Sequence, residues 1–267
     1  MIALDKEKET LLVPLFGKAI ETQKKTPILY DAKAVEISEK IDYDFKSLKI
    51  PGKTNTMMCL RAKLIDNFTD KFLKEKNDTV VLHLGCGLDS RCSRIDSENA
   101  NWYDLDFEEV ISIRKKFFKE SEKYHLIASS VTQLNWIENI PYGHANYLVI
   151  AEGLFMYLKE KKKKKLLNQI KKRTGSYTLI FDTYSVYTAK KVRNHPSIKK
   201  TGAKIQWGID NMKELEKWNS EFRFEKDIVF TSNEETEKMN WGTKLIYKIA
   251  NLFPMARNAQ KILIYNM

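Results

Sequence analysis

The feature of this sequence that most constrains its fold is an alternation, beginning at residue 78, of short apolar runs with segments of helical length. One such segment, 107–119, carries apolar residues at helical spacing. Because parallel neighbouring strands need crossover helices, the pattern predicts an α/β fold with a Rossmann-like, seven-stranded, mostly parallel sheet and helices on both faces. The strands are expected over residues 79–84, 102–106, 124–128, 146–151, 176–181, 222–230 and 261–265.

The residues before this alternation have a helical pattern instead. One amphipathic helix is expected over 10–22, a second is capped by Asp31, and a third is capped by Thr54 and carries an apolar stripe. No linker, repeat or low-complexity segment separates these helices from the alternating part. We therefore expect one integrated unit, with an N-terminal helical cap or lid (1–77) and an α/β domain (78–267).

Composition excludes several classes of protein. Hydrophobic residues make up 43% of the 267 residues, so a core can form without disulfides or metal. The three cysteines and four histidines show neither disulfide pairing nor metal-ligand spacing, so no metal is expected. The early charges do not form a signal peptide, and no apolar run reaches the roughly 18 residues of a membrane span. A cytoplasmic protein without a membrane partner is therefore expected.

The net charge of +11 comes from 46 basic and 35 acidic side chains, and it favours an anionic partner. A block of lysines over 159–165 opens an amphipathic segment and is interpreted as a solvated helix face. No nucleic-acid-binding motif accompanies it. We therefore expect an anionic small molecule as the partner, and a non-catalytic nucleic-acid-binding protein stays as an alternative. The sequence does not indicate an oligomeric state.

A glycine turn and an acid follow the first two expected strands. Gly85 and Gly87 allow a tight turn and a close approach of a ligand to the backbone, although Ser90, followed by Arg91, stands where a full dinucleotide motif has its third glycine. Asp106 ends the next strand about 20 residues further on, which suits a carboxylate that binds the ribose of an adenosine. Asp104 competes on the same strand face, but its position is further from the strand end. A dinucleotide-dependent oxidoreductase and a methyltransferase both fit.

A second acid, Glu152, follows the fourth expected strand and enters a turn. An unpaired buried charge is costly, so Glu152 is expected to bind either a cationic part of a ligand or backbone amides. His83, in contrast, lies inside the first strand and is expected to be a hydrogen-bonded core residue.

At this point a resemblance becomes specific. The segments 80–91, 102–106 and 150–157 resemble the leucine carboxyl methyltransferase family, in particular its bacterial branch of tetracenomycin-type O-methyltransferases. Segments 10–19, 27–31 and 206–210 are also similar to that branch, in the same order along the chain. The resemblance implies a class I methyltransferase with S-adenosyl-L-methionine as its cofactor and an oxygen of a small molecule as the methyl acceptor.

The resemblance also implies roles for single residues. The glycine turn is expected against the methionine part of the cofactor, Asp106 at the ribose and Glu152 beside the methionine end. Arg61 matches the family arginine that pairs with the cofactor carboxylate, a task that suits its planar guanidinium. Lys18 could assist Arg61, or could be an exposed helix lysine.

One departure from the family pattern concerns the adenine. Ser130 stands six residues before Trp136, where the family commonly has an aspartate, and Val131 follows it. Ser130 and Val131 are expected to bind the adenine, and a hydroxyl binds its amino group less strongly than a carboxylate does. Weaker cofactor binding, or an inactive family member, is therefore an open alternative.

The acceptor side is less defined. A carboxylate acceptor is ionised at neutral pH and needs no general base, whereas a phenolic hydroxyl needs one. Tyr157 and Tyr184 follow strand ends and His195 lies in a turn, so these three are the candidates for orienting or deprotonating the acceptor.

Overall fold

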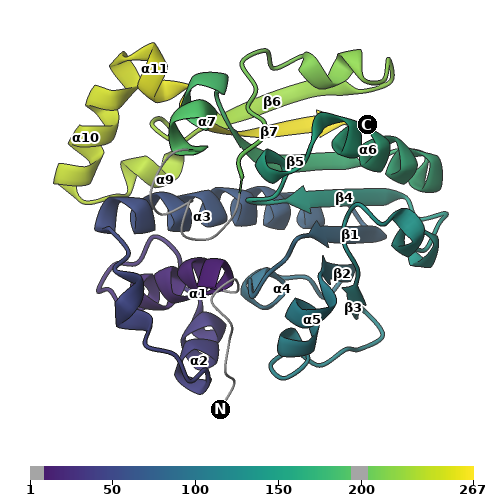
Figure 1. Cartoon of the computed structure of the whole chain (residues 1–267), viewed down its shortest axis with the longest axis horizontal. Helices are drawn as coiled ribbons and strands as arrows, with labels where there is room; N and C mark the ends of the chain where they lie inside the picture. Colours follow the sequence, from purple (N-terminus) through teal and green to yellow (C-terminus); the bar gives the residue numbers. More distant parts are fainter. Residues whose placement is uncertain (1–8, 194–203) are drawn as a thin grey trace.

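The computed structural model describes residues 9–193 and 204–267 (Figure 1). Its seven strands form one sheet in the order β3-β2-β1-β4-β5-β7-β6. The sheet is parallel except for β7, which pairs antiparallel with both β5 and β6. The predicted fold class is therefore confirmed. The strands are β1 (Thr79–Leu84), β2 (Ala100–Asp106), β3 (Tyr124–Ala128), β4 (Asn146–Ala151), β5 (Thr178–Tyr184), β6 (Arg223–Val229) and β7 (Gln260–Asn266).

The helices alternate with these strands as the pattern requires. The α-helices are α1 (Glu9–Thr22), α2 (Ala32–Lys40), α3 (Gly52–Glu75), α4 (Arg91–Arg94), α5 (Glu108–Arg114), α6 (Glu160–Thr174), α7 (Val186–Arg193), α9 (Glu234–Glu237), α10 (Trp241–Leu252) and α11 (Pro254–Arg257). Short 3-10 helices are η2 (Phe45–Leu48), η3 (Leu134–Asn139), η4 (Phe155–Tyr157) and η5 (Glu214–Lys217).

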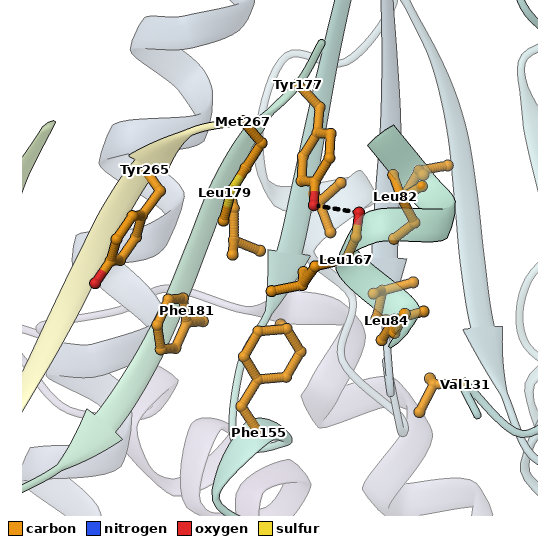
Figure 2. Close-up of a cluster of buried hydrophobic side chains, with 14 of the residues drawn as sticks. Leu82, Leu84, Val131, Phe155, Leu167, Tyr177, Leu179, Phe181, Tyr265 and Met267 are labelled. Carbon is orange, nitrogen blue, oxygen red and sulfur yellow. Dashed lines mark hydrogen bonds between the residues drawn. The ribbon is translucent and has the colours of Figure 1, made fainter. Parts of the chain in front are cut away.

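One face of the sheet packs against α6 and η3. Alternate residues of the central strands, such as Leu84 of β1 and Phe181 of β5, point into this cluster together with Leu167 of α6. Figure 2 shows the side chains of this core, in which Tyr177 donates a hydrogen bond of 3.0 Å from its hydroxyl to the Leu167 carbonyl. That bond gives the buried hydroxyl a partner, so burying it does not leave an unsatisfied polar group in the core.

The opposite face packs against α3, the longest helix. Leu60 and Ile65 of α3 contact strand residues that include Val81 and Ile150. Figure 1 shows α3 running along the sheet, while α1 and α2 lie below α3 in this view. Of the N-terminal helices, α3 is thus part of the layer that covers the sheet.

The helices α1 and α2 pack onto the segment that follows β1. Leu12 and Leu15 of α1 share a hydrophobic cluster with Leu88. Asp31 caps α2 by accepting from the backbone N–H of Ala34 at 2.8 Å, as predicted, and also accepts from the Ser90 hydroxyl at 2.5 Å. The same carboxylate thus caps a helix and joins it to the end of the glycine turn.

Several predicted boundaries were wrong. Thr54 does not cap the third helix, because that helix begins at Gly52 with Pro51 as its N-cap. The fifth strand extends beyond Phe181 to Tyr184, since it pairs with β7 over its whole length.

The lysine block is solvated except for Lys163, which is fully buried. Within the described residues, no helix is long and apolar enough to span a membrane.

Candidate functional site

The carboxyl ends of β1, β2, β4 and β5 bring the predicted site residues to one edge of the sheet. After β1, Gly85 (φ +64°) and Gly87 (φ +54°) have the left-handed backbone that the glycine turn requires. A Cβ on Gly85 would lie 3.0 Å from Leu154 Cδ1, and one on Gly87 would lie 3.4 Å from Leu11 Cδ2. The turn is therefore closed on one side by the segment after β4 and on the other by α1.

Asp106 lies beside this turn at the end of β2. Its carboxylate accepts from the backbone N–H groups of Gly87 and Phe107, both at 2.7 Å, so each oxygen keeps a lone pair for a ligand hydroxyl. Burial raises the pKa of Asp106, and the two N–H groups oppose that rise.

Asp104, the competing acid, is enclosed. It contacts Arg114 and accepts from Trp102 Nε1 at 2.9 Å and from the Tyr124 hydroxyl at 2.6 Å. His83 Nδ1 lies 3.0 Å from it, so His83 is the hydrogen-bonded core residue that was predicted. Because its partners surround it, Asp104 has no free side toward a ligand.

Glu152 follows β4 and pairs with two arginines. Arg61 Nε of α3 donates to Glu152 Oε1 at 2.9 Å, and Arg91 Nη2 donates to Oε2 at 2.5 Å. Burial acts to raise the pKa of Glu152, but Arg61 and Arg91 outweigh it and lower the pKa to about 2. The carboxylate therefore stays ionised and holds both guanidinium groups at the edge of the sheet.

Arg61 has a second partner that the sequence did not predict. Its Nη1 donates to Asp182 Oδ2 of β5 at 3.0 Å, and Asp182 Oδ1 accepts from the backbone N–H of Gly153 at 2.6 Å. Arg61 Nη2 donates to none of the described residues, and it lies 3.5 Å from the place that a Cβ on Gly153 would take. Glycine at this position leaves that donor accessible.

Lys18 does not contact Arg61 and is not an exposed helix lysine. It is buried, and its Nζ pairs with Asp89 Oδ2 at 3.0 Å. Asp89 also contacts Arg91 and Arg94. Burial acts to raise the pKa of Asp89, but Arg94, Lys18 and Arg91 together hold it well below its usual range. Lys18 thus connects α1 to the same ion-pair network that holds Glu152.

The two tyrosine candidates lie on the Arg61 side of this network. Tyr157 in η4 and Tyr184 at the end of β5 pack against one apolar cluster. Burial raises the pKa of Tyr157 and raises that of Tyr184 to about 12, so both phenols are neutral at physiological pH. His195, the third candidate, lies outside the described residues.

Ser130 and Val131 follow β3, next to β2. The backbone N–H of the preceding Ser129 donates to the Asp106 carbonyl at 2.9 Å, so this loop is tied to the end of β2. The Ser130 hydroxyl lies 3.2 Å from that of Thr132, while the Val131 side chain is buried in the core. Only the backbone of Val131 could therefore contact a ligand.

The sequence interpretation missed Asp182 and several other members of the network, among them Asp89, Arg91, Asp66, Arg94 and Gln260. Asp182 is fully buried, and it directly follows the predicted fifth strand (176–181) as Glu152 follows the fourth, so the rule that selected Glu152 would have selected Asp182 too, but it was not applied there. Asp66 and Arg94 carry no such signal, because their pairing joins α3 to α4, and Gln260 meets Asp182 only through the β5–β7 pairing.

These groups fit S-adenosylmethionine as a ligand. The positive-φ glycine turn lies directly against Asp106, which has acceptor capacity left for ribose hydroxyls. The Nη2 donor of Arg61 is available for a carboxylate. A nucleoside that also carries a carboxylate matches this donor and acceptor set.

Proteins of known structure share this architecture. The same architecture occurs in magnesium protoporphyrin IX methyltransferase (ChlM) of Synechocystis PCC 6803, with a TM-score of 0.51. The match covers 88% of this chain and 94% of that chain at 10% identity, so the likeness is one of fold.

The sequence comparisons are more specific. The model of the leucine carboxyl methyltransferase family matches residues 12–171. The tetracenomycin polyketide synthesis O-methyltransferase TcmP of Streptomyces glaucescens is 34% identical over 82% of this chain and 81% of that protein. The S-adenosyl-L-methionine-dependent methyltransferase dpfgK of Gibberella zeae is 24% identical over 94% of this chain and 92% of that protein. The chain therefore belongs to the leucine carboxyl methyltransferase family, which confirms the predicted resemblance and S-adenosylmethionine as the cofactor.

Proposed function

We propose that this protein is an O-methyltransferase that transfers the methyl group of S-adenosylmethionine to a carboxylate of an anionic small molecule in the cytoplasm. The observation that carries the proposal is the pair of neutral phenols, Tyr157 and Tyr184, beside Arg61 at the sheet edge. Neither phenol acts as a base near neutral pH. A carboxylate acceptor needs no base, because it is already ionised.

The described histidines support the same choice of acceptor. His83 is buried against Asp104, His125 stacks on Tyr103, and His144 pairs with Asp78 before β1, at the opposite edge of the sheet. His83 does reach the site network, with Nε2 3.3 Å from Arg91 Nη1, but both of its ring nitrogens have partners in the core, so no described imidazole is free to act as a base at the candidate site. A phenolic acceptor would need His195 as its base, and it is the second candidate.

In the proposed arrangement the protein contributes binding and alignment. Gly85 and Gly87 give the cofactor access to the backbone, Asp106 accepts from its ribose, and Arg61 Nη2 binds its carboxylate. Glu152 keeps Arg61 in place, and Ser130 with the Val131 backbone faces the adenine. The bound cofactor supplies an electrophilic methyl group. The tyrosine hydroxyls orient the acceptor oxygen in line with that group.

The chemistry of the product distinguishes the two acceptors. The enzyme is incubated with methyl-labelled S-adenosylmethionine and with matched aromatic compounds that carry a carboxylate, a phenolic hydroxyl or both. A methyl ester releases labelled methanol in alkali, whereas a phenolic ether does not. We expect alkali-labile label only where a carboxylate is present. Alkali-stable label that appears only with phenolic acceptors would overturn the carboxylate proposal. Thermal stabilisation by NAD but not by S-adenosylmethionine would overturn the assignment of the cofactor.

A further inference from the structure

The helices α10 and α11 expose an apolar surface that the proposed reaction does not use. Seven of the twelve large hydrophobic side chains that are exposed in the described part of the chain lie within 15 residues here. Figure 1 shows these two helices at one extremity of the molecule. We define the outer surface by these residues: Trp241, Leu245, Ile246, Ile249, Leu252, Phe253 and Met255.

The helix α10 turns its apolar face toward solvent, whereas an ordinary surface helix turns that face toward the core. Trp241, Leu245 and Ile249 recur every four residues, so they form one stripe, and all three face solvent. The polar contacts lie on the other side, where Asn251 binds the Thr231 hydroxyl at 2.9 Å and the Tyr247 ring is buried against the sheet layer. An apolar face of this size on a well-anchored helix indicates a partner.

Charge identifies the kind of partner. The segment 241–259 contains three basic residues, Lys244, Lys248 and Arg257, and no acidic residue. Lys248 is exposed beside the apolar stripe, and a single carboxylate, Glu237 of α9, pairs with Lys244 and lies 3.8 Å from Lys248. A second copy of the chain docked on this face would bring two sets of these three cations together, with Glu237 as the ion-pair partner of the two lysines in each copy, so the face stays net positive. An anionic surface offsets them.

We propose that the outer surface docks on an anionic lipid bilayer. A Trp, Leu, Ile, Phe and Met face flanked by lysine and arginine is the composition of interfacial helices. With 12 residues α10 is about 18 Å long, too short to cross the roughly 30 Å of a bilayer core, so it lies in the interface. This departs from the expectation of no membrane partner, which rested on the lack of a spanning segment.

Docking would also orient the candidate site. The outer surface leads into β7, whose first residue, Gln260, donates from Nε2 to Asp182 Oδ2 at 3.1 Å. The site edge and the outer surface are therefore joined by a few residues. The docking itself does not depend on the proposed reaction, so each can fail without the other.

Co-sedimentation of the full chain with vesicles tests the proposal. We expect binding to mixed phosphatidylglycerol–phosphatidylcholine vesicles that weakens with salt, and much weaker binding to pure phosphatidylcholine. Ile249→Glu and Leu252→Glu should each reduce partitioning at least tenfold, and Lys248→Ala about fivefold. The control, Tyr142→Glu, changes an aromatic side chain that is 73% exposed elsewhere and should bind as the unmodified protein does.

Tryptophan fluorescence gives a second readout. Trp241 is 78% exposed, whereas the other four tryptophans are at most 8% exposed. Phosphatidylglycerol vesicles should shift the emission to the blue, and Trp241→Phe should remove that shift. No binding to these vesicles, or equal binding by Ile249→Glu, would overturn the proposal. So would sedimentation velocity that shows a dimer which Ile249→Glu converts to monomers, because the surface would then join two copies.

Discussion

Arg61 of α3 and Asp182 of β5 form an ion pair across 121 residues, with Nη1 3.0 Å from Oδ2. Asp182 is fully buried and also accepts from the Gly153 backbone, so β5 sets the direction in which Arg61 points. The arginine that the proposed function assigns to the cofactor carboxylate is thus oriented by a fully buried acid whose two oxygens already accept from Arg61, Gly153 and Gln260. That relationship can be tested apart from the reaction.

Asp182→Asn should weaken both stability and cofactor binding. The amide keeps the shape and the contact with Gly153 but leaves Arg61 with one fewer carboxylate, and removing one partner of a buried pair costs about 3 kcal/mol. Urea denaturation measures that loss, and calorimetry should show at least tenfold weaker S-adenosylmethionine binding. The matched control is Asp227→Asn, which breaks a partly exposed pair with Lys261 and should cost no more than about 1 kcal/mol. Equal effects in both variants would contradict the orienting role.

Substitution of two neighbouring acids of β2 should affect different properties: cofactor binding for Asp106 and stability for Asp104. Asp106→Ala removes the proposed ribose contact and should weaken S-adenosylmethionine binding at least tenfold, about 1.4 kcal/mol, as should Arg61→Ala. Asp104→Asn should instead lower the free energy of unfolding by about 3 kcal/mol, because Arg114 loses its buried partner. Calorimetry and urea denaturation on each variant separate the effects. Unchanged affinity in both alanine variants would show that the cofactor site lies elsewhere.

The glycine turn offers a comparison between strain and crowding. Gly85 and Gly143 both have positive φ, but a Cβ on Gly143 would meet nothing within 4 Å, whereas one on Gly85 would lie 3.0 Å from Leu154 Cδ1. Gly143→Ala should therefore cost about 1 kcal/mol, the strain alone. Gly85→Ala should cost more and should also weaken cofactor binding. Equal losses of unfolding free energy would mean that Leu154 moves aside at no cost.

The sequence predicted what depends on periodicity and local chemistry. The bounds of β3 and β4 and the Asp31 cap follow from alternation and capping preference, and the structure has them as predicted. Glu152 and Asp106 were found because parallel strands bring their carboxyl ends to one edge. Asp182 directly follows the predicted fifth strand and could have been selected by the same rule, whereas its place inside β5 depends on the antiparallel pairing with β7, which is not a local property.

Other features depend on contacts that no local pattern records. The lysine block looks like a solvated face, yet packing against η4 and the Trp207 ring buries one lysine of it, Lys163. The apolar stripe of α10 has the period of a core-facing helix, and only the tertiary structure shows that it faces outward. The pairing of Lys18 with Asp89 likewise depends on how α1 docks on the glycine turn.

The buried Lys163 lies against the turn that carries Tyr157, one of the acceptor-side candidates. Its Nζ donates to the carbonyls of Leu158 at 2.8 Å and Phe155 at 3.4 Å, which flank Tyr157, and lies 3.9 Å from the centre of the Trp207 ring. Burial lowers the pKa of Lys163 to about 7, although Glu160 and Glu214 act to raise it. The ammonium that holds this turn is therefore partly deprotonated near neutral pH.

This shift predicts a pH dependence of stability. Between pH 7 and the ordinary lysine pKa, the unfolded chain binds a proton at Lys163 that the folded chain does not, so the free energy of unfolding rises with pH. Relative to Lys163→Met, the unmodified protein should gain up to about 1.4 kcal/mol per pH unit across that window, and the difference should level off below it. Urea denaturation at several pH values measures this, with Lys164→Met, an exposed neighbour, as the control that should show no such slope. A flat difference for Lys163→Met as well would mean that the buried ammonium keeps its proton.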